Sequence, residues 1–258
     1  MKSDHRHVFA VRSEAVAYAE VPQSMMFRGA AHGMTRIASL VWMLTNTATG
    51  HHTLVDTGAI SLAPASGLQA TQAHIAKTWS IDGQLGIEGA LDRFGVSPDQ
   101  IETVILTHLH ADHVANLPKF RHARIVLSRR GWHNATSEKD PWFQKYPQDI
   151  LHYIENEHAG PVELVDDEAS PSPGIRLIWL GGHSPCSQGV VFNTAGQRIA
   201  LAGDVIPMFR NIEQNIPTGH YENLREIRDG WERLKGISDV IIPSHDPDVP
   251  QYLQVNFP

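Results

Sequence analysis

Apolar residues alternate with polar ones, or form short uninterrupted runs, along most of the chain, and this pattern predicts β-strands. Strands are predicted at residues 8–18, 37–45 and 53–56, with a turn at 46–50 joining the second to the third. Further strands are predicted at 104–106 and directly before His183, Asp204 and His245, and residues 190–192 are expected to pair with 198–201.

Two segments have helical spacing instead. A helix is predicted over 88–94, and Gly95 should end it because a residue without Cβ suits a left-handed cap. A second helix, over 222–235, carries Leu224, Ile227, Trp231 and Leu234 on one face. A short helix is also expected near Asp112, whose carboxylate favours a helix N-terminus. Strands and helices interspersed in this way indicate an α/β protein.

Composition is that of a globular protein, with 41% hydrophobic and 19% charged residues. No stretch resembles a linker, so we expect a single domain over residues 1–258, with residues 1–7 flexible. No apolar run approaches the roughly 20 residues that cross a bilayer, and the charged start lacks a signal-peptide core, so neither a membrane partner nor export is expected. The single cysteine, Cys186, suits a reducing compartment, and the expected location is the cytoplasm.

The formal charge is −7, from 28 acidic and 21 basic residues. This balance argues against a nucleic-acid partner, because phosphate binding needs a basic surface. A small-molecule substrate is therefore expected. The sequence leaves the oligomeric state open, a homodimer included.

The densest chemical signal is a run of potential metal ligands after the apolar stretch 104–106. Residues His108, His110, Asp112 and His113 place three imidazoles and a carboxylate within six positions. If the apolar stretch is a strand, alternation sends His108 and His110 to the same side, where they can hold one ion together. Zinc, iron and manganese all accept these ligands. The alternative is that these histidines lie on an ordinary polar loop.

Three later positions repeat one pattern, in which an apolar run ends at a turn and then presents a single ligand. These are His183, Asp204 and His245. With the first run they make seven ligands, enough for two ions if Asp204 bridges them. The remaining histidines that lack this strand-end setting are expected at the surface, among them His51, His52, His74, His122, His133, His152 and His158.

These motifs resemble those of the metallo-β-lactamase superfamily in type and order. The resemblance covers roughly residues 37–250 and includes the His-x-His-x-Asp-His run, His183, Ala-Gly-Asp at 202–204 and Ser-His-Asp at 244–246. Asp56, within Leu-Val-Asp-Thr-Gly, resembles the aspartate that supports the metal loop from behind in that family. The resemblance implies a four-layer αββα sandwich with the site along one edge of the paired sheets.

Within the superfamily the chain is most similar to the N-acyl homoserine lactonase group, in residues 202–204, 210–213 and 243–247. In that group two zinc ions hold a bridging hydroxide that opens a lactone ring. The resemblance implies one zinc on His108, His110 and His183, and another on Asp112, His113 and His245. It also implies that Asp204 bridges the ions and that Asp112 carries a proton to the leaving alkoxide, so that both aspartates are catalytic. Iron or manganese would fit the same ligands.

One departure affects the substrate. Many of these lactonases have a tyrosine three residues after the bridging aspartate, and this chain has Pro207 there. A cyclic amide or a thioester therefore remains open beside a lactone, as does the mononuclear iron persulfide dioxygenase reaction of the same fold. Residues proposed to line the substrate pocket are Met26, Phe27, Trp142, Phe209, His220 and Tyr221.

Overall fold

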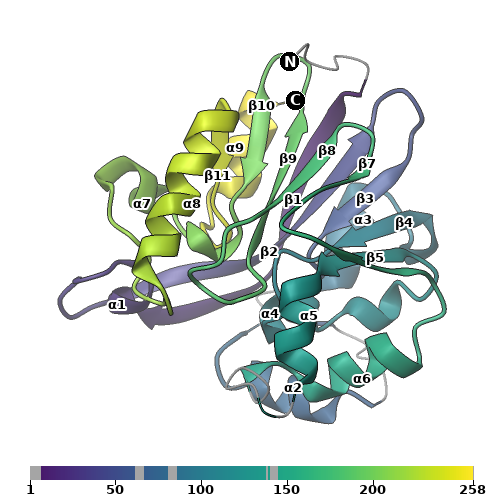
Figure 1. Cartoon of the computed structure of the whole chain (residues 1–258), viewed down its shortest axis with the longest axis horizontal. Helices are drawn as coiled ribbons and strands as arrows, with labels where there is room; N and C mark the ends of the chain where they lie inside the picture. Colours follow the sequence, from purple (N-terminus) through teal and green to yellow (C-terminus); the bar gives the residue numbers. More distant parts are fainter. Residues whose placement is uncertain (1–6, 62–66, 81–85, 138, 140–144, 258) are drawn as a thin grey trace.

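The computed structural model describes residues 7–61, 67–80, 86–137, 139 and 145–257, which form two β-sheets packed face to face (Figure 1). The first sheet is antiparallel from β1 to β3 and parallel from β3 to β6. Its strands are β1 (Phe9–Pro22), β2 (Met34–Asn46), β3 (His52–Val55), β4 (Ile101–Ile105), β5 (Arg124–Ser128) and β6 (Val162–Val165). The second sheet has the order β11-β10-β9-β8-β7, in which only the β10–β11 pair is parallel. Its strands are β7 (Glu168–Ser172), β8 (Ile175–Trp179), β9 (Gln188–Asn193), β10 (Arg198–Leu201) and β11 (Val240–Ile242).

Helices cover the outer faces of both sheets. Helices α3, α5 and α6 pack on the first sheet, and α8 packs on the second. The α-helices are α1 (Gln23–Met26), α2 (Gln69–Ile75), α3 (Ile87–Phe94), α4 (Ala111–Val114), α5 (Arg129–Thr136), α6 (Gln148–Asn156), α7 (Phe209–Gln214), α8 (Leu224–Ile237) and α9 (Val249–Asn256). The result is the expected four-layer αββα sandwich.

Strand alternation explains the layers. In β2, Trp42 faces the second sheet and shares a buried cluster with Phe192 of β9, whereas its neighbour Val41 faces outward and packs with Leu91 of α3. Helix α8 carries its apolar side chains at helical spacing on one face. With this face, Trp231 and its neighbours cover the outer face of the second sheet. Most strands therefore contribute to two hydrophobic cores, which explains the long apolar runs in the sequence.

Most predicted elements are present, with shifted ends. Helix α3 ends at Gly95, whose φ of 77° is left-handed as expected. Helix α8 begins two residues later than predicted, because the Asn223 side chain accepts hydrogen bonds from the N–H groups of Arg225 and Glu226 and so caps the helix.

The ligand run lies beyond its strand. Strand β4 ends at Ile105, so the side chains of His108 and His110 project from a loop and not from the face of a strand. The prediction from strand alternation was therefore wrong on this point. Two hydrogen bonds from Gln188 of β9 hold this loop, one from its side chain to the Leu106 carbonyl at 2.7 Å and one from its backbone to the Thr107 carbonyl at 2.9 Å. A residue of the second sheet thereby fixes the loop that follows strand β4 of the first sheet. Within the described ranges, no helix is both long and apolar enough to cross a membrane.

Candidate metal centre

The structure brings all seven predicted ligands together at one edge of the paired sheets. They form two groups, within each of which the ligand atoms lie within 4.8 Å of one another. Four residues come from the loop and short helix after β4, and three from the ends of β8, β10 and β11. The first group is His108, His110, His183 and Asp204, and the second is Asp112, His113 and His245.

The first group has the spacing of a single-ion site. His110 Nδ1 lies 3.0 Å from His108 Nε2 and 3.0 Å from His183 Nε2. Nitrogens bound tetrahedrally to zinc at about 2.0–2.1 Å are roughly 3.3 Å apart, close to this arrangement. The three side chains therefore fit one cation with little rearrangement.

Asp204 connects the two groups. Its Oδ2 lies 3.1 Å from His245 Nε2, 3.4 Å from His183 Nε2 and 3.6 Å from His108 Nε2. Its Oδ1 lies 3.3 Å from His113 Nε2. One carboxylate thus reaches nitrogens of both groups, which is the geometry that a bridging ligand requires.

Two buried polar atoms at this centre lack a hydrogen-bond partner among the described residues. They are His113 Nε2 and Asp204 Oδ1. Their 3.3 Å separation is not aligned as a hydrogen bond, and a buried polar atom left unpaired costs about 1–3 kcal/mol. A cation between the imidazole and the carboxylate would satisfy both atoms, so the donor set fits a metal centre.

Contacts on the far side of three imidazoles orient them toward the centre. His113 Nδ1 donates to Asp56 Oδ2 at 2.8 Å, His245 Nδ1 to the Ala38 carbonyl at 2.8 Å, and His183 Nδ1 to the His220 carbonyl at 2.9 Å. Each bond holds the ring through Nδ1 and turns Nε2 toward the other ligands.

Asp56 lies directly behind the loop, fully buried. Its carboxylate also accepts hydrogen bonds from the Thr107 backbone and hydroxyl, each at 2.7 Å. Its φ of 58° is left-handed, a conformation that aspartate tolerates better than most residues. Asp56 therefore sets both the loop's path and the orientation of His113.

Replacing Asp56 with Asn should weaken metal binding at the group that contains His113. The variant keeps the size and tolerates the same φ, but it loses the charge that orients His113, so we expect a loss of metal affinity of about 10- to 100-fold. Competition of zinc binding against a chromophoric chelator would measure the loss. The control is Asp99→Asn in the exposed turn before β4, which should bind zinc as the parent does. Equal affinity of the Asp56 variant and the parent would contradict this role.

The protein environment separates the histidines into two electrostatic classes. Burial lowers the pKa of His108, His110 and His183, so these imidazoles are neutral and their lone pairs are available at neutral pH. Burial also acts to lower the pKa of His113 and His245, but the Asp204 carboxylate and its acidic neighbours outweigh it and raise both. Burial opposes ionisation of Asp204, yet the surrounding imidazoles, His245 first, hold its pKa well below its usual range.

A cavity of about 620 Å³ opens onto the centre. Its base includes His110, Asp112, Asp204 and His245. Its lining also includes polar and charged side chains such as Lys145 and Asp149. The apolar residues of the lining, called here the apolar wall, include Val21, Met25, Met26, Ile37 and Trp79.

Of the five predicted pocket residues that the structure describes, Met26 and His220 line this cavity. The Phe27 ring lies under the Arg210 guanidinium at 4.5 Å, and the Phe209 ring packs on Tyr252 at 5.0 Å. The Tyr221 hydroxyl accepts a hydrogen bond from Arg28 Nε at 3.0 Å. These three residues therefore belong to the body of the protein, and Trp142 lies outside the described residues.

Sequence reasoning missed several residues that shape the site. The Trp79 ring lies 5.9 Å from the His245 ring, and His74, which is exposed as expected, also lines the cavity. The buried Cys186 Sγ accepts from the Leu109 N–H and pairs with the Tyr146 hydroxyl at 3.2 Å. The sequence carried a signal for Gln188, because this polar residue begins strand β9 ahead of the apolar residues 190–192.

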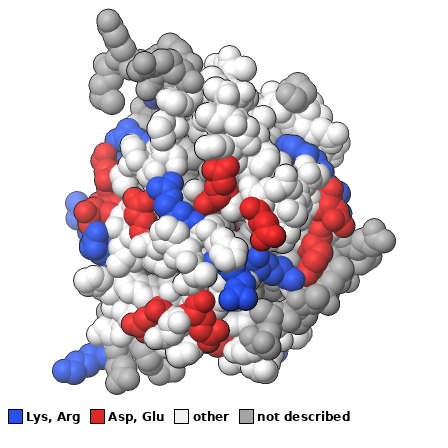
Figure 2. Space-filling model, turned by 90° about the vertical axis from the view of Figure 1, so that its right-hand side faces the viewer, with Lys and Arg blue, Asp and Glu red and all other residues white. Residues whose placement is uncertain are grey.

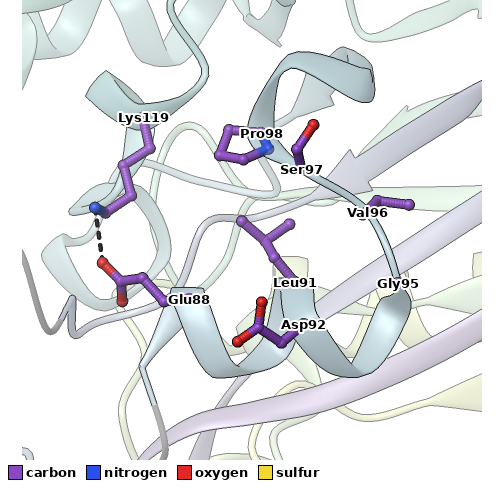
Figure 3. A pocket seen from close by; sticks show the side chains of 8 residues that line it. All are labelled: Glu88, Leu91, Asp92, Gly95, Val96, Ser97, Pro98 and Lys119. Atoms are coloured by element: carbon purple, nitrogen blue, oxygen red, sulfur yellow. Dashed lines mark ion pairs between the residues drawn. The ribbon is translucent and has the colours of Figure 1, made fainter.

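Other surface features lie apart from the centre. A shallow hollow beside α3 contains an ion pair between Lys119 and Glu88 at 2.7 Å and none of the seven ligands (Figure 3). On the face shown in Figure 2, acidic and basic side chains are interspersed and form no large patch of one sign.

The sequence is similar to those of known proteins. Metallo-beta-lactamase domain-containing protein 1 of Xenopus laevis is 27% identical over 67% of this chain and 64% of its own length. An N-acyl homoserine lactonase of Bacillus thuringiensis is 24% identical over 62% of each chain. The chain thus spans slightly less than two thirds of the length of these relatives.

Solved structures share the fold. The structure of an N-acyl homoserine lactone hydrolase with the product N-hexanoyl-L-homoserine at its catalytic metal centre superposes with a TM-score of 0.75, at 18% identity, over 95% of this chain and 96% of that one. A quorum-quenching N-acyl homoserine lactone lactonase gives a TM-score of 0.74 at 20% identity, over 95% of each chain. Residues 34–245 match the family model described as the metallo-beta-lactamase superfamily. The chain therefore belongs to the metallo-beta-lactamase superfamily.

Proposed function

We propose that this protein is a dinuclear zinc hydrolase that opens small cyclic esters. The observation that carries the proposal is Asp204, whose two oxygens reach both ligand groups at the base of the cavity. The names of the lactonase relatives and structural neighbours support the same reaction class.

The ligand roles follow the two groups. His108, His110 and His183 would hold one ion, Asp112, His113 and His245 would hold the other, and Asp204 would contact both. Bound zinc supplies two effects, a lowered pKa of coordinated water and polarisation of a carbonyl.

Asp112 is the residue best placed to handle a proton. Its side chain is 18% exposed and lines the cavity, whereas Asp204 lies deeper. Its Oδ2 lies 3.6 Å from His113 Nε2 and 3.7 Å from His245 Nε2, and the Ser39 hydroxyl donates to its carbonyl at 3.0 Å. A carboxylate held in this way can accept a proton and deliver it to the alkoxide that leaves the opened ring.

The cavity wall indicates the kind of substrate. Val21, Ile37 and Trp79 offer apolar contacts, which suit an apolar substituent on the ring. Lys145 is ion-paired with Glu222 at 2.8 Å, so these two lining residues present a neutralised pair to the substrate. The site therefore favours an uncharged ester with an apolar substituent.

Metal analysis combined with a substrate panel tests the proposal. The purified protein should contain two zinc ions per chain and hydrolyse a lactone, and removal of metal by a chelator should abolish turnover that zinc then restores. The panel should include cyclic amides and thioesters. Preference for either of these would correct the substrate, and one iron per chain with oxygen consumption on a persulfide would replace the proposed reaction. Full turnover by metal-free protein would overturn the proposal.

A further inference from the structure

The His220 side chain lines the cavity next to the first ligand group. Its ring centroid lies 4.9 Å from that of His183 and 6.1 Å from that of His110, and it is nearly parallel to the His110 ring. It belongs to neither ligand group. Within the described part of the chain its ring nitrogens make no hydrogen bond, so the N–H that every imidazole carries is available to a bound molecule.

The backbone of His220 is held from two sides, which limits where its exposed ring can lie. Its carbonyl accepts the 2.9 Å hydrogen bond from His183 Nδ1, and its N–H donates to the Met25 carbonyl at 2.9 Å. The residue is thus held between a predicted ligand and the segment that forms the apolar wall. Such fixation from both sides is what a group that positions substrate requires.

Competing donors near the centre are few. Residues 205–208, directly after Asp204, are all apolar. The Tyr146 hydroxyl pairs with Cys186, and the Lys145 ammonium pairs with Glu222. The indole N–H of Trp79 is a further competitor, but that ring lies beside His245, in the second group. His74 and Thr78 also line the cavity, and both are exposed.

We propose that His220 is a further substrate-contacting residue, whose ring N–H donates a hydrogen bond to the carbonyl oxygen of the cyclic ester. This inference rests on the proposed hydrolase function. The bond strengthens as negative charge develops on that oxygen during attack, and no proton leaves the ring. The contribution is therefore greater in the transition state than in the bound substrate.

Paired variants of His220 test the inference. His220→Phe keeps a ring of similar size and removes the donor, so kcat should fall by about a hundredfold while KM changes little. His220→Gln retains a donor and should recover part of the loss. Both variants should keep two metal ions per chain, and a parallel loss of metal would show that the ring acts only by supporting His183, which would overturn the proposal.

Two further variants separate His220 from its neighbours. His74→Gln, at another histidine of the cavity, should cost much less than His220→Phe. Trp79→Phe removes the competing N–H and keeps a ring. A hundredfold loss in Trp79→Phe combined with full activity in His220→Phe would assign the donor to Trp79 and overturn the inference.

The failure of the inference can be told apart from failure of the proposed function. If the wild-type holoenzyme hydrolyses no member of the panel, the proposed function fails on its own. Calorimetric titration of the holoenzyme with γ-hydroxybutyrate, the hydroxy acid of a simple lactone, then tests the contact directly. Binding about tenfold weaker in His220→Phe supports the hydrogen bond, and unchanged binding overturns it.

Discussion

Replacing Asp204 with Asn is expected to lower turnover by about a thousandfold, the largest loss at any single position. Asn keeps the size of the side chain but removes its charge, and it turns an NH₂ group toward imidazole nitrogens that lie 3.1–3.6 Å from the carboxylate. The variant therefore loses the one ligand that reaches both groups, and a loss of several kcal/mol in metal-assisted stabilisation corresponds to such a factor.

Metal content and kinetics measured together show whether this explanation holds. We expect Asp204→Asn to bind fewer than two ions per chain by elemental analysis. The matched control is Asp246→Asn, because Asp246 is also buried and adjacent to a ligand but accepts hydrogen bonds from the Phe209 and Asp248 N–H groups and belongs to neither ligand group. An Asp204 variant with two ions and normal turnover would contradict the bridging role.

Replacing Gly131 with Ala should strongly destabilise the protein. A Cβ at this position, in the first turn of α5, would lie 1.9 Å from Cys186 Cβ and 2.7 Å from its Cα, so backbone has to move. Overpacking of this kind costs about 1–3 kcal/mol or more, which lowers Tm by several degrees in a protein of this size. Since Cys186 Sγ holds the Leu109 N–H of the ligand loop, zinc affinity should fall as well.

Thermal unfolding with and without zinc measures both effects. The control is Gly236→Ala, in helix α8, where a Cβ meets nothing within 4 Å. That variant should be stabilised by up to about 1 kcal/mol, because alanine is the better helix former. Equal Tm values for Gly131→Ala and the parent would show that α5 shifts without cost.

The sequence could predict that the candidate ligands would lie together, because the segments that carry them follow recognisable strands. His183, Asp204 and His245 come after apolar runs that end in a turn, and strand ends meet at one edge of a sheet. The loop geometry of His108 and His110 could not be predicted, because it depends on Gln188 and Asp56, which approach from elements far away in the sequence.

The substrate pocket was predicted less well, for a physical reason. Apolar and aromatic character says that a side chain is buried but not which space it borders. Met26, the last residue of α1, lines the cavity, whereas Phe27, the next residue, packs against Arg210. The two side chains point in different directions because the helix ends between them. Trp79 and His74 reach the cavity only because the segment around α2 packs beside the centre.

The division of ligands between the two sheets has a consequence for the life of the protein in a cell. Ions bound at this centre would link the two sheets. A metal that binds only the folded state adds about 2.7 kcal/mol to the free energy of unfolding when its free concentration is 100 times its Kd. The supply of the metal would thus govern how quickly proteases degrade the chain, and a shortage of it would lower the amount of enzyme as well as its activity.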